Sequence, residues 1–113
     1  MRLPAAERAF IDPTKIRDYL LSAEHPIGRF KAAVFRAAGY SRDDWKQLQK
    51  DLLVLAQAGE VSRGGTTRFG SKYLVRGRLG GAADRSVRVI SVWIVRTAED
   101  FPRFVTAYPE EGP

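Results

Sequence analysis

The chain has 113 residues, of which 44% are apolar, and its 19 basic and 13 acidic residues give a net charge of +6. This length leaves room for one domain with a modest core, and the apolar fraction is typical of a globular fold. There is no cysteine and only one histidine. These counts exclude disulfides, thiolate metal sites and a cysteine nucleophile, and they argue against a histidine-cluster metal site.

The sequence carries no signal for a membrane or for export. No apolar run approaches the ~20 residues that a membrane span needs, and the N-terminus lacks the hydrophobic segment of a secretory signal. The lack of cysteine also favours a reducing compartment. We therefore expect a cytoplasmic protein that acts as a stand-alone chain and has no membrane partner.

The N-terminal half predicts three helices. Asp12-Pro13 is a favourable start for a first helix that runs to about Leu21. A second helix over roughly 29–38 ends at Gly39. Ser41-Arg42-Asp43-Asp44 is typical of a capping box and opens a third helix, which ends at Gly59. Its inner face is an apolar stripe of Trp45, Leu48, Leu52 and Leu55.

The C-terminal half changes to the two-residue periodicity of strands. Strands are expected near 60–63, 72–79, 87–95 and 102–108, with a loop over 64–70. Helices followed by hairpin-linked strands predict an α+β fold, in which three N-terminal helices pack on one face of a four-stranded antiparallel sheet. We expect one domain, with a helical half over about 12–58 and a sheet over about 60–109.

Basic residues are concentrated in the predicted sheet. Between Val61 and Arg96 there are eight of them and one acid, Asp84. The eight are Arg63, Arg68, Lys72, Arg76, Arg78, Arg85, Arg88 and Arg96. Such a surface suits a phosphate-bearing polyanion, because the arginine fork matches phosphate geometry. The alternative is a solvated basic face without a ligand.

His25 is the one side chain whose unperturbed pKa permits easy proton transfer near neutral pH. It lies in the break between the first two predicted helices. Lys31 lies near the start of the second helix, where free N–H groups also favour an anion. His25 can equally be a helix-break residue that bonds a backbone carbonyl, and Lys31 a solvated surface lysine.

In the last predicted strand, alternation places Phe104, Thr106 and Tyr108 on one face. Two hydroxyls at this spacing can bind one phosphate, or a base and a phosphate; the alternative is that both are ordinary strand formers. Tyr73, among the arginines, is a candidate for base stacking. The chain contains no phosphate-binding loop, dinucleotide fingerprint, paired zinc ligands or nucleophile elbow, so no cofactor or metal is expected.

Two blocks of the sequence carry a resemblance, the first to a bacterial domain family and the second to a wider superfamily. Leu20-Leu21-Ser22-Ala23-Glu24-His25-Pro26-Ile27-Gly28-Arg29-Phe30-Lys31-Ala32 is similar to a leucine–His-Pro–Gly–Lys-Ala block of an uncharacterised bacterial domain family. That family occurs as the C-terminal toxin module of polymorphic toxins and as stand-alone proteins. The ending Val105-Thr106-Ala107-Tyr108-Pro109 resembles the last strand of ribonuclease toxins of the barnase–EndoU–colicin–RelE superfamily.

The resemblance implies roles for particular residues. His25 would be the acid/base and Lys31 a phosphate contact, and Thr106 and Tyr108 would orient the phosphate or a base. Arg88 or Arg76 would stabilise the charge of the transition state. The expected RNA-binding residues are Arg68, Lys72, Tyr73, Arg76 and Arg78. In place of the superfamily's Asn-Gly or Asp-Gly turn, this chain has Ala83-Asp84-Arg85, which predicts a different turn type.

The expected function is therefore that of a bacterial toxin, a metal-independent endoribonuclease that cleaves cellular RNA, with tRNA as one candidate. Attack by the RNA 2′-OH would leave a 2′,3′-cyclic phosphate. The implied partners are RNA and a separately encoded neutralising protein, whose acidic surface would cover the basic sheet. The alternatives are a non-catalytic RNA- or protein-binding module of the same fold, and a protein-binding module with no role in RNA.

Overall fold

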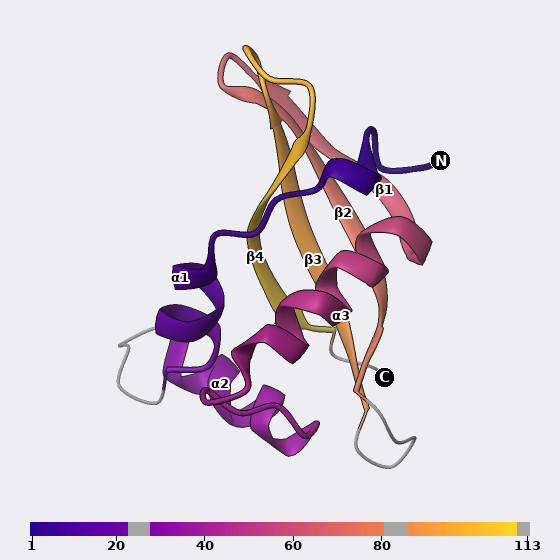
Figure 1. Ribbon diagram of the computed structural model, residues 1–113. Coiled ribbons are helices and arrows are strands. Elements are labelled where there is room, and N and C mark those ends of the chain that lie inside the picture. The colour runs from indigo at the N-terminus through magenta and orange to yellow at the C-terminus, as the bar shows by residue number, and fades with distance from the viewer. Residues whose placement is uncertain (23–27, 81–85, 111–113) are drawn as a thin grey trace.

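The computed structural model describes residues 1–22, 28–80 and 86–110 and shows an α+β architecture (Figure 1). Its elements are η1 (Ala6–Arg8), α1 (Pro13–Lys15), η2 (Ile16–Leu20), α2 (Gly28–Ala37), α3 (Trp45–Ala58), β1 (Glu60–Thr67), β2 (Gly70–Leu79), β3 (Val87–Arg96) and β4 (Pro102–Pro109). The strands form an antiparallel sheet in the order β1-β2-β3-β4. No helix among these residues is long and apolar enough to cross a membrane.

The first predicted helix forms, in two parts. The Asp12 carboxylate accepts a hydrogen bond from the Thr14 backbone N–H at 3.0 Å, which confirms the predicted cap. The helix then widens into the π-helical turn η2, where the Leu21 N–H donates to the Ile16 carbonyl at 2.9 Å. Such wide turns are frequent at functional sites. Ile16 is fully buried, as the apolar pattern predicts.

The ends of α2 and α3 follow the predicted signals with one exception. Gly39 ends α2 with a φ of 100°, a left-handed conformation that glycine adopts at little cost. Before α3, the Ser41 hydroxyl accepts a hydrogen bond from the Asp44 N–H at 3.2 Å. The Asp44 side chain makes no capping hydrogen bond, so only half of the predicted box forms.

Strand β1 is longer than predicted. It extends to Thr67, because a bulge between Arg63 and Gly65 absorbs the glycine pair instead of ending the strand. Gly65 has a φ of 107°, which a side chain would make costly. The predicted loop over 64–70 is therefore wrong, and the connection to β2 is confined to a tight turn at Arg68 and Phe69.

The helices do not all lie flat on the sheet. Helix α3 crosses one face and packs on β2, whereas α1, η2 and α2 gather beside β4 (Figure 1). Leu55 of α3 fits against Gly77, where any Cβ would collide with it. Helix α2 packs mainly on η2 and reaches the sheet at β4. Of the three helices expected to cover one face of the sheet, only α3 lies across it. Helix α2 packs mainly on η2 instead, and Phe35 of α2 and Leu20 of η2 belong to the buried core.

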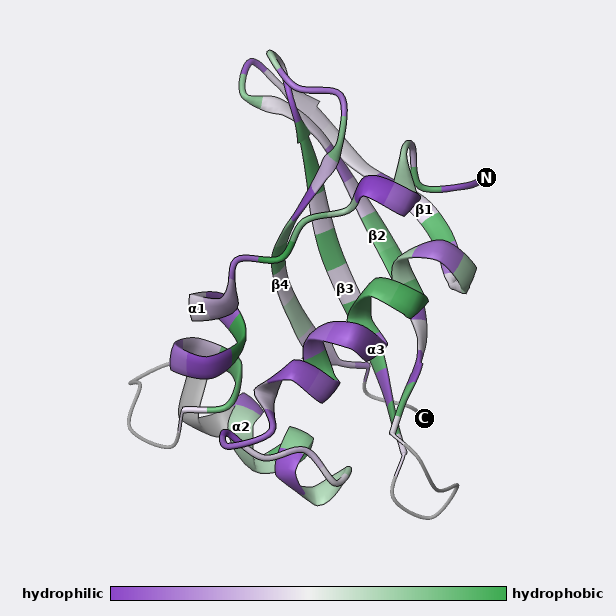
Figure 2. Ribbon diagram, in the orientation of Figure 1, coloured by the Kyte–Doolittle hydropathy of each residue, from purple (hydrophilic) through white to green (hydrophobic). Residues whose placement is uncertain are grey.

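The core lies between α3 and the sheet. Trp93 is fully buried and packs edge-on against Phe104, with ring centroids 5.3 Å apart. Its indole N–H donates to the Ser91 hydroxyl at 2.8 Å, and that hydroxyl donates to the Val75 carbonyl at 2.8 Å. Figure 2 shows hydrophobic positions alternating with polar ones along the strands, as one covered face requires.

Candidate functional site

The sheet has a covered face under α3 and an opposite face, here called the open face. Val75, Val89 and Trp93 point to the covered face and are fully buried. Their strand neighbours alternate with them, so Ile90 and Val92 belong to the open face, where both are only partly buried. The open face is the surface on which exposed strand side chains can meet a ligand.

A bulge in β4 decides which of its side chains reach the open face. Trp93 pairs with Phe104 and Val92 with Thr106, so Val105 has no partner in register. The bulge reverses the alternation, and Phe104 is buried on the covered face while Thr106 lies on the other. The prediction that Phe104, Thr106 and Tyr108 share one face is therefore wrong for Phe104. Thr106 and Tyr108 do share the open face.

Thr106 forms one wall of a pocket between β4 and the helices beside it. The pocket has a volume of about 360 Å³. Its lining residues are Thr14, Lys15, Tyr19, Lys31, Val105 and Thr106. They carry two ammonium groups and three hydroxyls and no carboxylate, and such a lining favours an anion. We call this pocket the lysine pocket.

Lys31 links the two sides of the lysine pocket. Its Nζ donates to the Tyr19 hydroxyl at 3.0 Å and to Thr106 Oγ1 at 3.1 Å. The ammonium also lies 5.1 Å from the centre of the Tyr19 ring. In the part of the chain that the structure describes, no carboxylate forms an ion pair with Lys31. Among the described residues, two hydroxyls hold this positive charge in place and no carboxylate neutralises it.

Lys15 brings the second charge. The Lys15 ammonium donates a hydrogen bond to the carbonyl of the bulged Val105 at 3.1 Å. The bulge that places Thr106 on the open face therefore also holds Lys15 in position. Lys15 follows directly after Thr14, whose hydroxyl donates to Asp12 at 2.8 Å. The backbone N–H of Thr14 and its hydroxyl both donate to the Asp12 carboxylate, and these two hydrogen bonds keep the pKa of Asp12 below its usual value. Asp12 thus stays ionised at neutral pH and orients the start of the helix.

A larger hollow of about 540 Å³ lies between α3 and β2. Its lining contains Asp51 and Glu60 as well as Arg76 and Arg78, so charges of both signs meet there. This mixture suits an anionic ligand less well than the lysine pocket does. The smaller pocket is accordingly the better candidate site.

Two of the predicted phosphate-binding arginines have an internal partner. Arg76 Nε lies 3.5 Å and Arg88 Nε 3.6 Å from the two carboxylate oxygens of Glu110. Arg76 also donates to the Ser62 hydroxyl at 3.1 Å. Glu110 comes directly after β4 and returns to the open face, which sequence spacing does not reveal.

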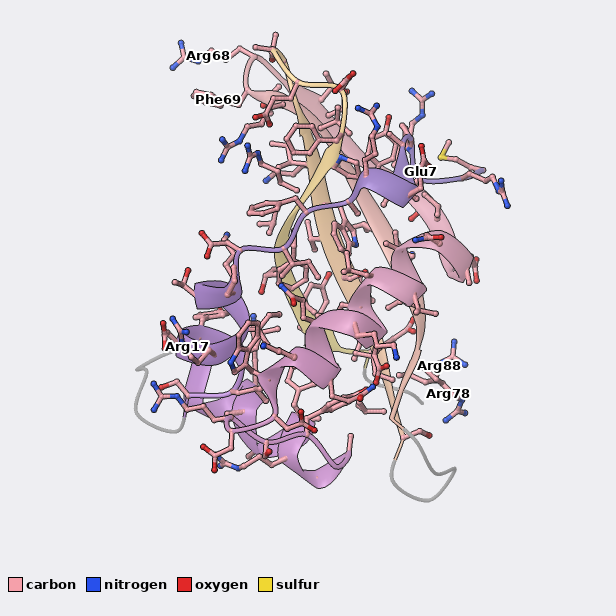
Figure 3. All side chains as sticks on the ribbon, in the orientation of Figure 1. Glu7, Arg17, Arg68, Phe69, Arg78 and Arg88 are labelled. Atoms are coloured by element: carbon pink, nitrogen blue, oxygen red, sulfur yellow. The ribbon has the colours of Figure 1, made fainter. Side chains whose placement is uncertain are left out.

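The other predicted RNA-binding residues are spread over the sheet. Arg78 donates to the Ser86 hydroxyl at 3.1 Å, and Lys72 is exposed on β2. Arg68 stacks on the exposed Phe69 ring at the tip of the sheet (Figure 3). Tyr73 lies on the covered face and packs against the core. Its side chain therefore lies on the face opposite to that of Arg76, Arg78 and Lys72.

His25 lies outside the described residues. In the sequence it stands between Tyr19 and Lys31, both of which line the lysine pocket. Sequence reasoning missed Thr14, Lys15 and Tyr19 as pocket residues. The apolar pattern marks Tyr19 as an inner helix residue, but nothing local to the chain indicates that β4 lies beside this helix.

Among the described residues, no cluster of three or more histidine, cysteine, aspartate or glutamate side chains is placed to hold a metal ion. Of the described residues that line the lysine pocket, none is an acid or an imidazole. Whatever chemistry its described residues support is that of ammonium and hydroxyl groups.

The fold matches a chain from a solved toxin complex. The similar structure is described as a contact-dependent growth inhibition toxin–immunity protein complex from Klebsiella pneumoniae 342. The TM-score is 0.70 and the identity is 17%, and the match covers 96% of this chain and 98% of that chain. At this identity the likeness shows a shared fold.

The family of the chain is shown by its sequence. It matches the domain of unknown function DUF6883 over residues 2–111, and the chain belongs to this family. A comparison with curated proteins found no match.

Proposed function

We propose that this chain is a toxin domain that cleaves cellular RNA as a metal-independent endoribonuclease. The observation that carries the proposal is the lysine pocket, where Lys31 is held between the hydroxyls of Tyr19 and Thr106. A cation held in place beside hydroxyl groups is an arrangement that stabilises the extra negative charge on a phosphate under attack.

The reaction needs no nucleophile from the protein, because RNA supplies its own. The 2′-oxygen attacks the adjacent phosphorus and forms a P–O bond, while the bond from phosphorus to the 5′-oxygen breaks. In our proposal His25, as a neutral imidazole, takes the 2′-OH proton, and the imidazolium so formed protonates the departing 5′-oxygen. The products are a 2′,3′-cyclic phosphate and a 5′-hydroxyl end.

The candidate residues that the structure describes have supporting roles in this proposal. Lys31 and Lys15 hold the phosphate, and the Thr106 hydroxyl orients it. Tyr108, 37% exposed on the open face, would contact the neighbouring base or phosphate. Arg76, Arg78, Arg88, Lys72 and Arg68 bind the rest of the RNA, for which tRNA is a candidate.

Fold and charge support a toxin with a neutralising partner. The similar structure is that of a growth inhibition toxin with its immunity protein. With a net charge of +6, this chain suits both an RNA substrate and an acidic protein that covers the same surface. We infer that the toxin acts in the cytoplasm and that a separate protein blocks it.

The deciding experiment is incubation of the purified protein with total RNA in EDTA, followed by analysis of the fragment ends. Cyclic phosphate and 5′-hydroxyl ends that disappear in His25→Ala are the expected result. Expression of the wild type should also stop bacterial growth, and His25→Ala and Tyr108→Phe should relieve the arrest. Intact RNA in EDTA, or full toxicity in both variants, would count against the proposed site.

A second candidate is a non-catalytic binding module of the same fold. It is favoured by the open face itself, where Leu74, Ile90 and Val92 remain partly exposed beside arginines. A surface of apolar and basic groups suits RNA or an acidic protein without any chemistry. Salt-sensitive RNA binding without cleavage products would identify this function.

A further inference from the structure

We propose that Arg76 and Arg88 form a second phosphate subsite on the open face, and that Glu110 occupies this subsite in the free protein. The inference rests on the proposed function, since it concerns how RNA extends beyond the lysine pocket. It assigns to Glu110 the part of an internal carboxylate that an RNA phosphate displaces.

The arginines are brought together by the register of the sheet. Arg78 lies directly opposite Arg88 in the β2–β3 pair, and Arg76 lies opposite Ile90 in the next row of the open face. Figure 3 shows Arg78 and Arg88 extending from the same end of the sheet. Like charges in direct cross-strand contact are unfavourable unless an anion lies between or beside them. In the described part of the chain, Glu110 is the carboxylate that pairs with this group.

The pairing with Glu110 is loose. Both contacts run through Nε, at 3.5 Å from Arg76 and 3.6 Å from Arg88, which is longer than a good charge-assisted hydrogen bond. Oxygen Oε2 of Glu110 is buried and accepts no hydrogen bond among the described residues. A buried carboxylate oxygen without a hydrogen bond is unfavourable, so the contact is not optimised for stability.

An ion pair elsewhere on the same sheet provides the contrast. Arg103 binds Glu99 in the bidentate way, with distances of 2.8 and 2.7 Å. It is also packed between the rings of Phe10 and Phe101. That arrangement is typical of a structural bridge. Arg76 and Arg88 instead share one carboxylate through single contacts, and a phosphate with more acceptor oxygens can replace it.

The position of the subsite relative to the lysine pocket fits a continuous RNA strand. Thr106, Tyr108 and Glu110 follow one another at alternate positions, so they lie on the same side of the chain. With a rise of ~3.4 Å per residue, Glu110 is ~14 Å along the chain from Thr106, or about two nucleotide steps of an extended single strand. Tyr108 lies between the two positions and can stack on the intervening base.

The test measures binding without cleavage. 2′-O-methyl oligonucleotides, which lack the attacking 2′-OH, are titrated into the full chain by NMR, from a dinucleoside monophosphate to a hexanucleotide. Arg88→Ala should lower the affinity for the hexanucleotide. It should also reduce the slope of log affinity against log salt concentration by about 0.7, the contribution of one phosphate contact in a single strand. It should leave the dinucleoside monophosphate, which reaches only the lysine pocket, unchanged. Arg76→Ala should do the same.

Glu110→Gln is the sharper variant, because it should strengthen binding. Removing the competing carboxylate is expected to tighten the hexanucleotide about two- to fivefold, the range of an exposed ion pair. Glu7→Gln is the matched control, since it removes the same charge from an exposed residue of η1, far from Arg78 and Arg88 in Figure 3. Chemical shifts of the free variants show whether the fold is retained.

The outcomes separate this inference from the proposed activity. Equal effects of Glu110→Gln and Glu7→Gln, or equal weakening of short and long ligands by Arg88→Ala, would overturn the subsite even if RNA is cleaved. Length-dependent binding with no cleavage of natural RNA would support the subsite and overturn the nuclease. If no oligonucleotide binds at low salt, the subsite is wrong and an acidic protein becomes the better ligand for the arginines.

Discussion

The ammonium of Lys31 lies 3.1 Å from the hydroxyl oxygen of Thr106 and thereby joins α2 to β4 across 75 residues of sequence. The two residues belong to elements that otherwise touch only lightly, and Tyr19 completes the contact from η2. The two hydroxyls hold the Lys31 ammonium at one place, where it can contact an anionic ligand. The candidate site depends on this arrangement more than on any single motif.

Replacing Lys31 by glutamine should abolish RNA cleavage without unfolding the protein. The change removes the charge that stabilises the attacked phosphate, and a loss of roughly 10²- to 10³-fold in rate is expected. The measurement is the cleavage rate of a defined RNA in EDTA. Lys50→Gln on the exposed surface of α3 is the control and should keep full activity. A Lys31→Gln protein that cleaves at the wild-type rate would remove the lysine pocket from consideration.

Thr106→Val tests whether the hydroxyl of this residue, rather than the shape of its side chain, contributes to cleavage. Valine keeps the branched side chain that suits β4 but cannot accept the hydrogen bond from Lys31. We expect the cleavage rate to fall about tenfold, the effect of a displaced but still present cation. Thr106→Ser, which keeps the hydroxyl, should retain most of the rate. If valine and serine give the same rate, the contact between Lys31 and Thr106 has no part in activity.

Ser91→Ala should destabilise the protein even though the change removes only one oxygen atom. The buried hydroxyl serves both the Trp93 indole N–H and the Val75 carbonyl. The buried indole N–H of Trp93 is then left without its partner, which costs about 1–3 kcal/mol of unfolding free energy. Urea unfolding followed by far-UV circular dichroism, a signal that does not depend on Trp93, measures the loss. Adding Trp93→Phe to Ser91→Ala should cost less than the sum of the two single changes, since the unpaired indole N–H is then gone.

We expect Tyr40 to make the stability of the fold depend on pH in the alkaline range. Burial, together with its 2.6 Å hydrogen bond to the Asp51 carboxylate, raises the pKa of the Tyr40 hydroxyl. The folded state therefore keeps the proton that the unfolded state releases near pH ~10. The stability that Tyr40 contributes is fully present below that pH and is lost as pH rises toward the folded pKa.

The check is a comparison of wild type with Tyr40→Phe across this range. At neutral pH the variant should be less stable, because it lacks the hydrogen bond to Asp51. Above pH ~10 the difference in unfolding free energy between the two proteins should shrink. Ionisation of Tyr40 stabilises the unfolded state of the wild type, and Tyr40→Phe lacks this ionisation. A difference that stays constant from pH 7 to 11 would contradict the raised pKa.

Local signals in the sequence were sufficient for most of the fold. The Asp12 cap, the stop at Gly39 and the leucine stripe of α3 depend on residues within one or two turns of each other, so they can be read without tertiary contacts. Two of the failures, the loop expected over 64–70 and the face expected for Phe104, have one physical cause. The bulges at Gly64 and Val105 arise from pairing with β2 and β3, and a single bulge exchanges the two faces for every later residue of the strand.

What the sequence by itself determined is the α+β class, the basic character of the sheet and the candidate status of Lys31, Thr106 and Tyr108. These follow from composition, periodicity and resemblance. Only the tertiary structure decided that Lys31 meets Thr106, that Lys15 joins them from α1, and that Glu110 holds Arg76 and Arg88. Such contacts join side chains that are distant in sequence. Their geometry is set by strand register and by how α2 packs on η2, and no local pattern encodes either.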